Sequence, residues 1–219
     1  MKVYFLLIIG LLSIVACKDK EQVAVNTNST ASSVQGSGDL KDFTIIDIEG
    51  SKFKKATKKD ENGHAVEEGY VLDGKKSGSW YNYYTDGRVT AIRNFVDGKV
   101  EGIYITIDDR GRIVQQSEYK NNYLDGFATL YKIGSRKMKE TFYKAGKREG
   151  IEKEYFEMGP VQKETSYKND ILDGKMRFYN DKAELIAEYE YKNGEKISGG
   201  ALKVEGSPVE TPSPVESTK

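Results

Sequence analysis

Side chains suited to acid–base, nucleophilic or metal chemistry are scarce in this sequence. It contains one histidine, His64, and one cysteine, Cys17. His64 directly follows the turn sequence Asn62-Gly63, a setting typical of a solvated loop residue. Zinc needs several nitrogen or sulfur ligands, and the sequence has no second histidine or cysteine to complete such a site. We therefore expect no metal site at these residues.

Carboxylates recur beside glycine, as in Asp125-Gly126 and Asp173-Gly174, a pattern that could suggest calcium binding. Calcium takes about six to eight oxygen ligands around one point. Each of these acids instead stands alone next to a glycine, which is typical of a turn. The sequence has no glycine-rich phosphate loop, no Gly-x-Ser-x-Gly nucleophile turn and no kinase signature. We expect no catalytic residue and no cofactor, so an enzyme is disfavoured.

The charge of the chain is balanced, with 34 basic and 34 acidic residues. Removal of an N-terminal signal segment would also remove Lys2 and leave the protein close to neutral. No electrostatic field of one sign dominates, which disfavours general nucleic-acid binding.

Aromatic side chains are the remaining candidates for binding chemistry, and most of them recur every 24 residues. Cross-strand aromatic pairs stabilise a sheet by about 0.2–1 kcal/mol each, so strict recurrence predicts a structural ladder. The periodic aromatic residues are Tyr83, Phe95, Tyr119, Tyr131, Tyr143, Tyr155, Tyr167, Tyr179 and Tyr191. Four aromatic residues break the period, and we expect them on the opposite face as candidate binding residues: Trp80, Tyr84, Tyr104 and Phe156.

The elements that position these residues follow from the 24-residue period. Contiguous copies begin at Asp73, Asp97, Asn121, Ala145 and Asn169. When each copy is numbered from 1 to 24, glycine recurs at position 6 and mostly at position 15, which leaves two runs of about eight residues, a usual strand length. Loops such as Thr85-Asp86-Gly87 predict a type I turn followed by a left-handed glycine. Each copy is therefore predicted to be a β-hairpin.

The three-residue loop places position 11 opposite position 17, as in Tyr83 with Val89. The connection to the next copy is expected to turn near position 3, which places position 23 opposite position 7 of that copy. The expected pairs are Phe95 with Ile103, Tyr119 with Phe127 and Tyr143 with Ile151, all on the same face as position 11. The predicted fold is all-β, an elongated single-layer antiparallel meander of about six hairpin repeats, each packed only on its neighbours.

The predicted repeat domain spans residues 42–206. It comprises a capping strand near its start, a degenerate hairpin at 49–72, repeats at 73–96, 97–120, 121–144, 145–168 and 169–192, and a closing strand within 193–206. Residues 17–41 contain no aromatic residue and are expected to be a flexible tether. Residues 207–219 contain three of the four prolines and are expected to be a disordered tail.

Residues 1–16 have the layout of a secretory signal, with one positive charge and an apolar stretch that is short for a membrane-spanning helix. The sequence Ile14-Val15-Ala16-Cys17 resembles a bacterial lipobox. That resemblance implies cleavage between Ala16 and Cys17, with lipid attached to the Cys17 thiol and to the new amino terminus; several acyl chains would anchor the protein stably. Lys18 is not the aspartate of an inner-membrane retention signal, so we expect the outer membrane of the bacterial envelope. Exposure at the cell surface stays open.

The repeat resembles the bacterial variant of the MORN repeat (membrane occupation and recognition nexus). The resemblance rests on G-x-W-x-x-Y-Y-x-x-G at Gly78 to Gly87, on the D-G and N-G turns and on the closing Tyr119-Lys120, and it covers about two-thirds of the chain. Proteins with this variant are often grouped as YwqK-type antitoxin-like proteins. The resemblance implies an antiparallel hairpin array that serves as a binding scaffold.

These observations predict a non-enzymatic, membrane-tethered scaffold that binds a protein partner at the bacterial envelope. The alternative is an antitoxin or immunity protein of the YwqK-like type that neutralises a toxin. A toxin-like reading frame beside the gene would favour the alternative.

Overall fold

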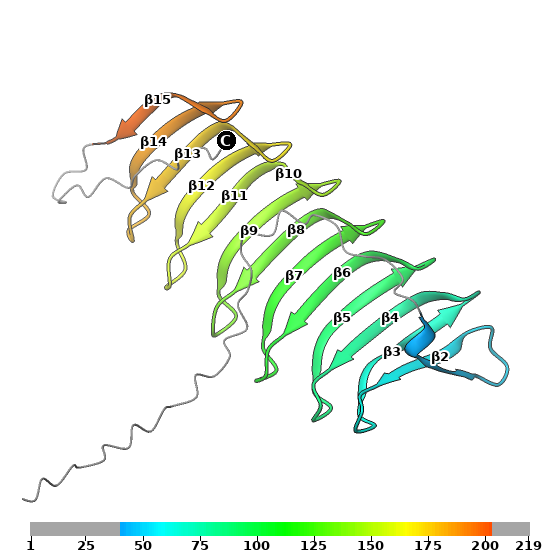
Figure 1. Cartoon of the computed structure of the whole chain (residues 1–219). Helices are drawn as coiled ribbons and strands as arrows, with labels where there is room; N and C mark the ends of the chain where they lie inside the picture. Colours follow the sequence, from blue (N-terminus) through cyan, green and yellow to red (C-terminus); the bar gives the residue numbers. More distant parts are fainter. Residues whose placement is uncertain (1–39, 203–219) are drawn as a thin grey trace, which may run out of the picture. The chain divides into compact units, whose positions relative to one another are not determined.

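The fold is given by a computed structural model that describes residues 40–202, whose strands form one antiparallel sheet of 15 strands (Figure 1). A 3-10 helix, η1 (Leu40–Asp42), comes first. The strands are β1 (Thr44–Asp47), β2 (Lys54–Lys59), β3 (Ala65–Leu72), β4 (Lys75–Tyr83), β5 (Val89–Val96), β6 (Lys99–Ile107), β7 (Ile113–Lys120), β8 (Tyr123–Tyr131), β9 (Lys137–Lys144), β10 (Lys147–Arg148), β11 (Gly150–Tyr155), β12 (Val161–Lys168), β13 (Ile171–Tyr179), β14 (Leu185–Lys192) and β15 (Glu195–Ala201). They follow one another in chain order, except that β10 pairs only with β9, which also pairs with β11.

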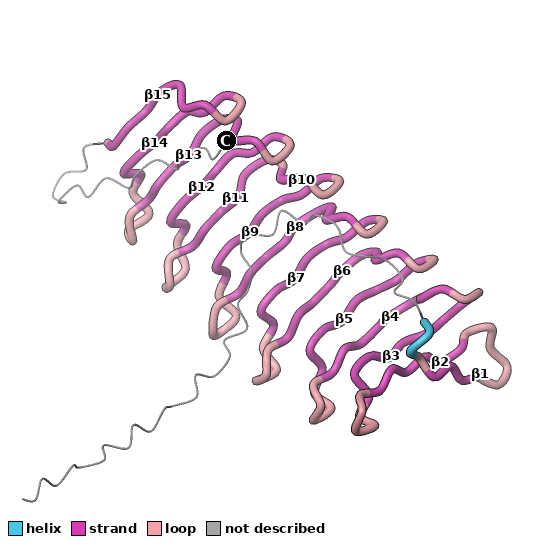
Figure 2. Tube along the Cα trace, viewed as in Figure 1, coloured by secondary structure: helices cyan, strands magenta, loops and turns pink. Residues whose placement is uncertain are grey.

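The sheet is an open single layer, and no α-helix occurs within residues 40–202. Strands β2–β3, β4–β5, β6–β7, β8–β9, β11–β12 and β13–β14 make six hairpins of the repeat. Figure 2 shows their connections gathered in two rows, one along each side of the sheet. The predicted all-β, single-layer antiparallel meander of about six hairpins is therefore confirmed. In the described part of the chain, no helix has the length and hydropathy needed to span a membrane.

The connections inside the hairpins are the predicted three-residue loops. In the β4–β5 loop, Tyr84 N donates to Arg88 O at 2.8 Å and Gly87 N donates to Tyr84 O at 2.9 Å, with Gly87 at φ 85°. Glycine suits this left-handed conformation because it has no Cβ to clash. The predicted pairing of positions 11 and 17 is confirmed in all five repeats: Tyr83 with Val89, Ile107 with Ile113, Tyr131 with Lys137, Tyr155 with Val161 and Tyr179 with Leu185.

The connections between hairpins differ from the prediction. Each is a two-residue turn at positions 1 and 2, such as Asp73-Gly74, where both residues have positive φ (50° and 76°), as a type I′ turn requires. The expected turn near position 3 is therefore wrong. Position 23 lies opposite position 4 of the next repeat: Phe95 pairs with Val100, Tyr119 with Leu124 and Tyr143 with Arg148, not with Ile103, Phe127 and Ile151.

The assignment of faces was also wrong, because each three-residue loop is followed by a β-bulge. Tyr83 pairs with Val89 but Asn82 pairs with Ala91, so Thr90 is an extra residue in β5. One extra residue moves every later side chain of a strand to the other face. Position 23 therefore lies on the face opposite position 11.

We call the side of the sheet that carries positions 8 and 23 the core face, and the side that carries positions 7 and 11 the open face. The core face holds two buried clusters. The first consists of Ala56, Val71, Trp80, Phe95, Val100, Tyr119 and Leu124, with Leu40 and Phe43 packed onto it. The second consists of Met176, Ala187, Tyr189 and Tyr191.

Candidate functional site

Trp80 is a core residue and lies on the same face as Phe95, so its predicted place on the opposite face is wrong. Its side chain is 0% exposed. Its ring makes edge contacts with Phe43 and Phe95, at centroid distances of 5.5 and 5.9 Å, and its Nε1 donates to Tyr70 O at 3.0 Å. The Lys76 ammonium lies 4.0 Å from the Trp80 ring centroid and forms a 2.6 Å ion pair with Glu67. A partner could not reach Trp80, and we do not retain it as a binding residue.

The other three off-period aromatic residues are not gathered into one site. Tyr104 lies half-buried on the core face, with its ring centroid 5.9 Å from that of Tyr119. Tyr84 begins the β4–β5 loop, where the Arg88 guanidinium lies 5.5 Å from its ring. Phe156 begins the β11–β12 loop, three hairpins further along the sheet. No common surface unites the four residues proposed from the sequence.

The periodic aromatic residues form two rows, one on each face of the sheet. Phe95, Tyr119, Tyr143, Tyr167 and Tyr191 are on the core face, and Tyr83, Tyr131, Tyr155 and Tyr179 are on the open face. Burial raises the pKa of Tyr119 to about 12. The pKa of Tyr167 is also raised to about 12, mainly by burial and further by the negative charge of nearby Glu152. These phenols therefore stay protonated at neutral pH and pack as neutral rings.

His64 is an exposed loop residue, as its place in the sequence predicts. Its side chain is 53% exposed, and its Nδ1 lies 3.2 Å from Asp60 Oδ2. Asp60 Oδ1 accepts hydrogen bonds from the backbone N–H groups of Asn62 and His64, so the carboxylate closes the turn. Within residues 40–202, no group of three or more histidine, cysteine, aspartate or glutamate side chains could hold a metal ion.

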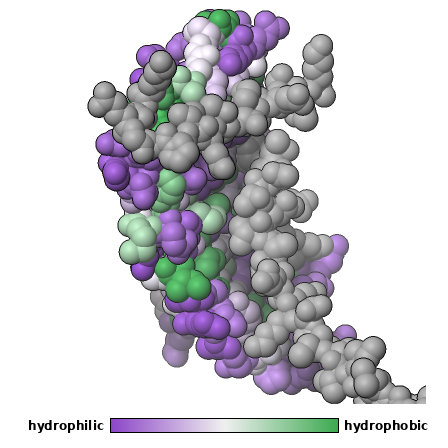
Figure 3. All heavy atoms as spheres, turned by 90° about the vertical axis from the view of Figure 1, so that its left-hand side faces the viewer, coloured by the Kyte–Doolittle hydropathy of each residue, from purple (hydrophilic) through white to green (hydrophobic). Residues whose placement is uncertain are grey.

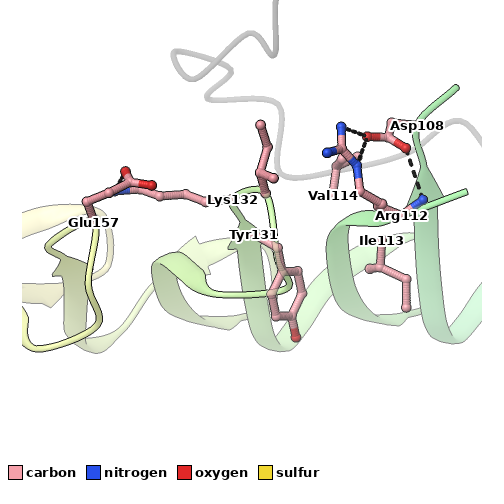
Figure 4. Close-up of a pocket in the computed structure, with 8 residues that line it drawn as sticks. Asp108, Arg112, Ile113, Val114, Tyr131, Lys132 and Glu157 are labelled. Atoms are coloured by element: carbon pink, nitrogen blue, oxygen red, sulfur yellow. Dashed lines mark hydrogen bonds and ion pairs between the residues drawn. The ribbon is translucent and has the colours of Figure 1, made fainter. Parts of the chain in front are cut away.

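A hollow lies among the loops of three successive hairpins, β6–β7, β8–β9 and β11–β12 (Figure 4). We call it the loop hollow. It has a volume of about 350 Å³ and is lined by Asp108, Arg112, Ile113, Val114, Tyr131, Lys132, Ile133 and Glu157. Figure 4 shows Tyr131 and Ile113 pointing to one side of the loops, away from the paired Asp108 and Arg112. A second hollow, lined by residues that include His64, Tyr83 and Asp86, lies between the first two loops of the same row.

Ion pairs hold the charged rim of the loop hollow in place. Arg112 Nε donates to Asp108 Oδ2 at 2.8 Å, and the backbone N–H groups of Arg110 and Arg112 both donate to Asp108 Oδ1 at 2.9 Å. The pKa of Asp108 is lowered to about 2, mainly by the hydrogen bond from the Arg112 side chain and further by these backbone donors. On the far side, Lys132 Nζ lies 3.2 Å from a Glu157 carboxylate oxygen and joins two neighbouring loops. The rim is therefore charged, yet its charges are already paired.

Two aliphatic side chains stand out beside this hollow. Ile133 is 70% exposed and Met158 is 78% exposed, each at the tip of its loop. Arg136 Nη1 donates to Glu157 O at 3.2 Å and lies 3.4 Å from Met158 Sδ, which ties the two loops together. In Figure 3, most of the face in view is hydrophilic and hydrophobic residues form small separate groups.

Sequence reasoning missed Ile133 and Met158 because it compared only aromatic residues with the period. The signal was nevertheless present in the sequence. Position 13, which Ile133 occupies, is Thr85, Asp109, Glu157 and Asp181 in the other repeats. Position 14, which Met158 occupies, is Asp86, Arg110, Gly134 and Lys182. An apolar residue at a loop tip that is otherwise polar marks a local departure from the repeat.

Comparisons with known proteins add little to this geometry. No protein-family model matches the chain, and no curated protein matches it. One solved structure with some similarity is that of an S. aureus TarM mutant in complex with fondaparinux, α-GlcNAc-glycerol and UDP, which is 9% identical over 72% of this chain, with a TM-score of 0.23. The match spans 21% of the TarM chain. A likeness at that score supports no statement about the fold or the function of this chain.

Proposed function

We propose that this chain is a non-enzymatic scaffold, tethered to the bacterial envelope by lipid at Cys17, which binds a protein partner through the loop hollow. The observation that carries the proposal is the exposure of Ile133 and Met158, at 70% and 78%, beside a hollow whose lining includes Ile113, Val114 and Tyr131. Apolar anchors surrounded by a polar rim are the usual anatomy of a protein-binding site.

The paired charges of the rim support a protein partner over a small charged ligand. Asp108 is engaged by Arg112, and Glu157 by Lys132, so neither carboxylate is free for a metal ion or a cationic ligand. Burying Ile133 and Met158 against a partner would remove apolar area from water, at about 25 cal/mol per Å². Three successive loops supply the surface, which gives it a specificity that one copy of the repeat lacks.

The proposal is tested by crosslinking in the native membrane. A photo-reactive crosslinker is placed at Arg110, on the loop beside the hollow, and the captured protein is compared between the otherwise unchanged chain and its Ile133→Asp and Met158→Asp variants. We expect each variant to lower capture about tenfold, as loss of an interface anchor does. Thr85→Asp is the matched control, because Thr85 occupies the same loop position as Ile133 in another hairpin. Unchanged capture by both variants would contradict the proposal.

The tether is tested separately, because Cys17 lies outside the described residues. We expect Cys17→Ser to abolish fatty-acid labelling and to move the protein into the soluble fraction. Full membrane partitioning without labelling would indicate an anchor of another kind.

A further inference from the structure

A second exposed apolar surface lies on the open face, toward the opposite ends of the strands from the loop hollow. Position 7 of the repeat holds Ile103, Phe127 and Ile151 in three successive copies, with side chains 45%, 48% and 46% exposed. We call these three residues the position-7 row. The copies on either side have Ser79 and Lys175 at this position, so the row is confined to β6, β8 and β11. Side chains in a continuous exposed apolar row commonly mark an interaction surface.

The spacing of the row restricts what can bind along it. Consecutive members are two strands apart, which corresponds to about 9.4–9.8 Å. In an α-helix laid across the strands, residues seven apart lie on one side, about 10.5 Å from one another. An extended chain presents its same-side residues about 6.8 or 13.6 Å apart, and neither distance matches. The row therefore fits a helix with an apolar residue at every seventh position.

Basic side chains lie alongside the row, nearer the turns than its members, while Glu118 and Phe142 lie between the members. Lys120 and Lys144 end strands β7 and β9, which alternate with the strands that carry the row, and both side chains are exposed. Each follows a core-face tyrosine, Tyr119 or Tyr143, so each is on the open face. Neither lysine forms an ion pair with any residue in the range 40–202, and the ammonium groups are open to a partner.

The acids nearby are mostly occupied by the turns. Backbone N–H groups of the following turn donate to the carboxylates of Glu101, Asp125 and Glu149, at 2.9, 3.0 and 3.0 Å. Glu118, which pairs across the strands with Ile103, is the exception. The Glu118 side chain also lies against Gly126, next to Phe127, so the basic character is strongest beside Ile151. Phe127 is also held in place, because its ring makes an edge contact with Phe142 at a centroid distance of 5.1 Å.

We propose that the position-7 row binds an acidic amphipathic helix of a partner protein. Apolar side chains at every seventh helix position would pack on Ile103, Phe127 and Ile151, and carboxylates on the flank of the helix that faces the turns would pair with Lys120 and Lys144. This inference goes beyond the function proposed for the loop hollow and does not depend on it.

The probe is a synthetic alanine-based helix of about 21 residues, with leucine at every seventh position and glutamate along the two flanks of the leucine stripe. Its fluorescence anisotropy is measured against the full-length protein in nanodiscs of neutral phosphatidylcholine. We expect saturable binding that weakens as salt is added, because ion pairs at an exposed surface are screened. The matched probe, with lysine in place of each glutamate, should bind at least about tenfold more weakly.

Variants of the protein locate the binding. We expect Phe127→Ser and the double change Lys120→Glu with Lys144→Glu each to weaken binding of the acidic helix about tenfold. Ile133→Ser, in the loop hollow, should leave the affinity unchanged, so failure of this proposal is distinct from failure of the proposed function. Circular dichroism confirms that each variant is folded, and Ile151→Ser replaces Phe127→Ser if the latter does not fold.

Four outcomes would overturn the proposal. They are the absence of binding, equal binding of the acidic and basic helices, full affinity in a folded Phe127→Ser variant, and loss of affinity in Ile133→Ser alone. Self-association of the protein that Phe127→Ser abolishes would instead identify a second copy as the occupant. Displacement of the helix by anionic vesicles, but not by neutral ones, would identify a lipid surface.

Discussion

The Tyr83 hydroxyl donates a hydrogen bond to the Glu68 carboxylate, at 3.1 Å, and so joins the end of β4 to the preceding hairpin. The same two repeat positions meet at Tyr179 and Glu164, where the hydroxyl donates at 2.9 Å. The pKa of Tyr83 is raised to about 12, mainly by burial and further by the hydrogen bond to Glu68. The rings of these tyrosines pack on the sheet, and their hydroxyl groups also link one repeat to the next by hydrogen bonds.

The raised tyrosine pKa values predict that the sheet loses stability in alkali. Tyr83, Tyr119 and Tyr167 each have a pKa of about 12 when folded, whereas an unperturbed tyrosine titrates near 10. Between these pH values the unfolded chain binds fewer protons than the folded one, so the free energy of unfolding falls as pH rises. Urea unfolding from about pH 9 to pH 12 measures this slope. Tyr119→Phe should make it shallower, and a flat profile for the unchanged protein would contradict the prediction.

Replacing Phe43 should uncover the single tryptophan. Phe43 precedes β1 and lies against Trp80 on the core face, so Phe43→Ala removes one wall of its site. We expect a loss of about 2 kcal/mol in the free energy of unfolding, below the range for a fully buried phenylalanine, and a red shift of the Trp80 emission. Phe53→Ala is the control, because Phe53 is 40% exposed and contacts Tyr70 instead. Equal red shifts in the two variants would refute this assignment.

Replacing Ala183 with glycine should stabilise the protein. It occupies the loop position of Gly87 and adopts φ 63°, a left-handed conformation that strains any residue with a Cβ. Ala183→Gly should therefore raise the free energy of unfolding by about 0.5–1 kcal/mol. Ala65→Gly, in strand β3, should lower it by a similar amount, since glycine weakens a strand. A lower melting temperature for Ala183→Gly would count against the loop conformation.

Replacing Glu152 and replacing Lys139 should change the free energy of unfolding by different amounts. Glu152 is 4% exposed, and its carboxylate lies 2.8 Å from Lys139 Nζ and accepts a 2.8 Å hydrogen bond from Thr141 Oγ1. Its repeat position holds the buried Met176 one copy later. Glu152→Met should be close to neutral, whereas Lys139→Met leaves a buried carboxylate without its cation and should cost about 3 kcal/mol. Equal losses in chemical denaturation would show that the charge is not buried as described.

The sequence predicted much of the sheet, because glycine spacing and strand length both depend on local chemistry. The three-residue loop at Thr85-Asp86-Gly87 and the pair Tyr83–Val89 follow directly from it. The faces could not be predicted in the same way. They depend on the extra residue Thr90, and nothing in the side chain of a threonine marks a bulge.

The candidate site was less accessible to sequence reasoning than the fold. The sequence marked Trp80 as a binding candidate because it breaks the 24-residue period. A large side chain that occurs in only one copy can equally close one end of a core, and Trp80 does so in contact with Phe43. The contribution of Phe43 could not be foreseen, since it comes from outside the repeats. Ile133 and Met158 carried a readable signal, which appears only when loop positions are compared across all copies.

The two-residue turns between hairpins also bear on how the length of the sheet could change in evolution. Every boundary between copies uses the same turn at positions 1 and 2, and each copy enters and leaves on the same face. Duplication or deletion of one whole 24-residue unit would therefore rejoin strands that already match in register and in face. Loss of the copy 121–144 would leave a continuous sheet but remove Ile133 and Phe127 together. The architecture thus tolerates a change in the number of copies, while the binding residues proposed above would limit which copies can be lost.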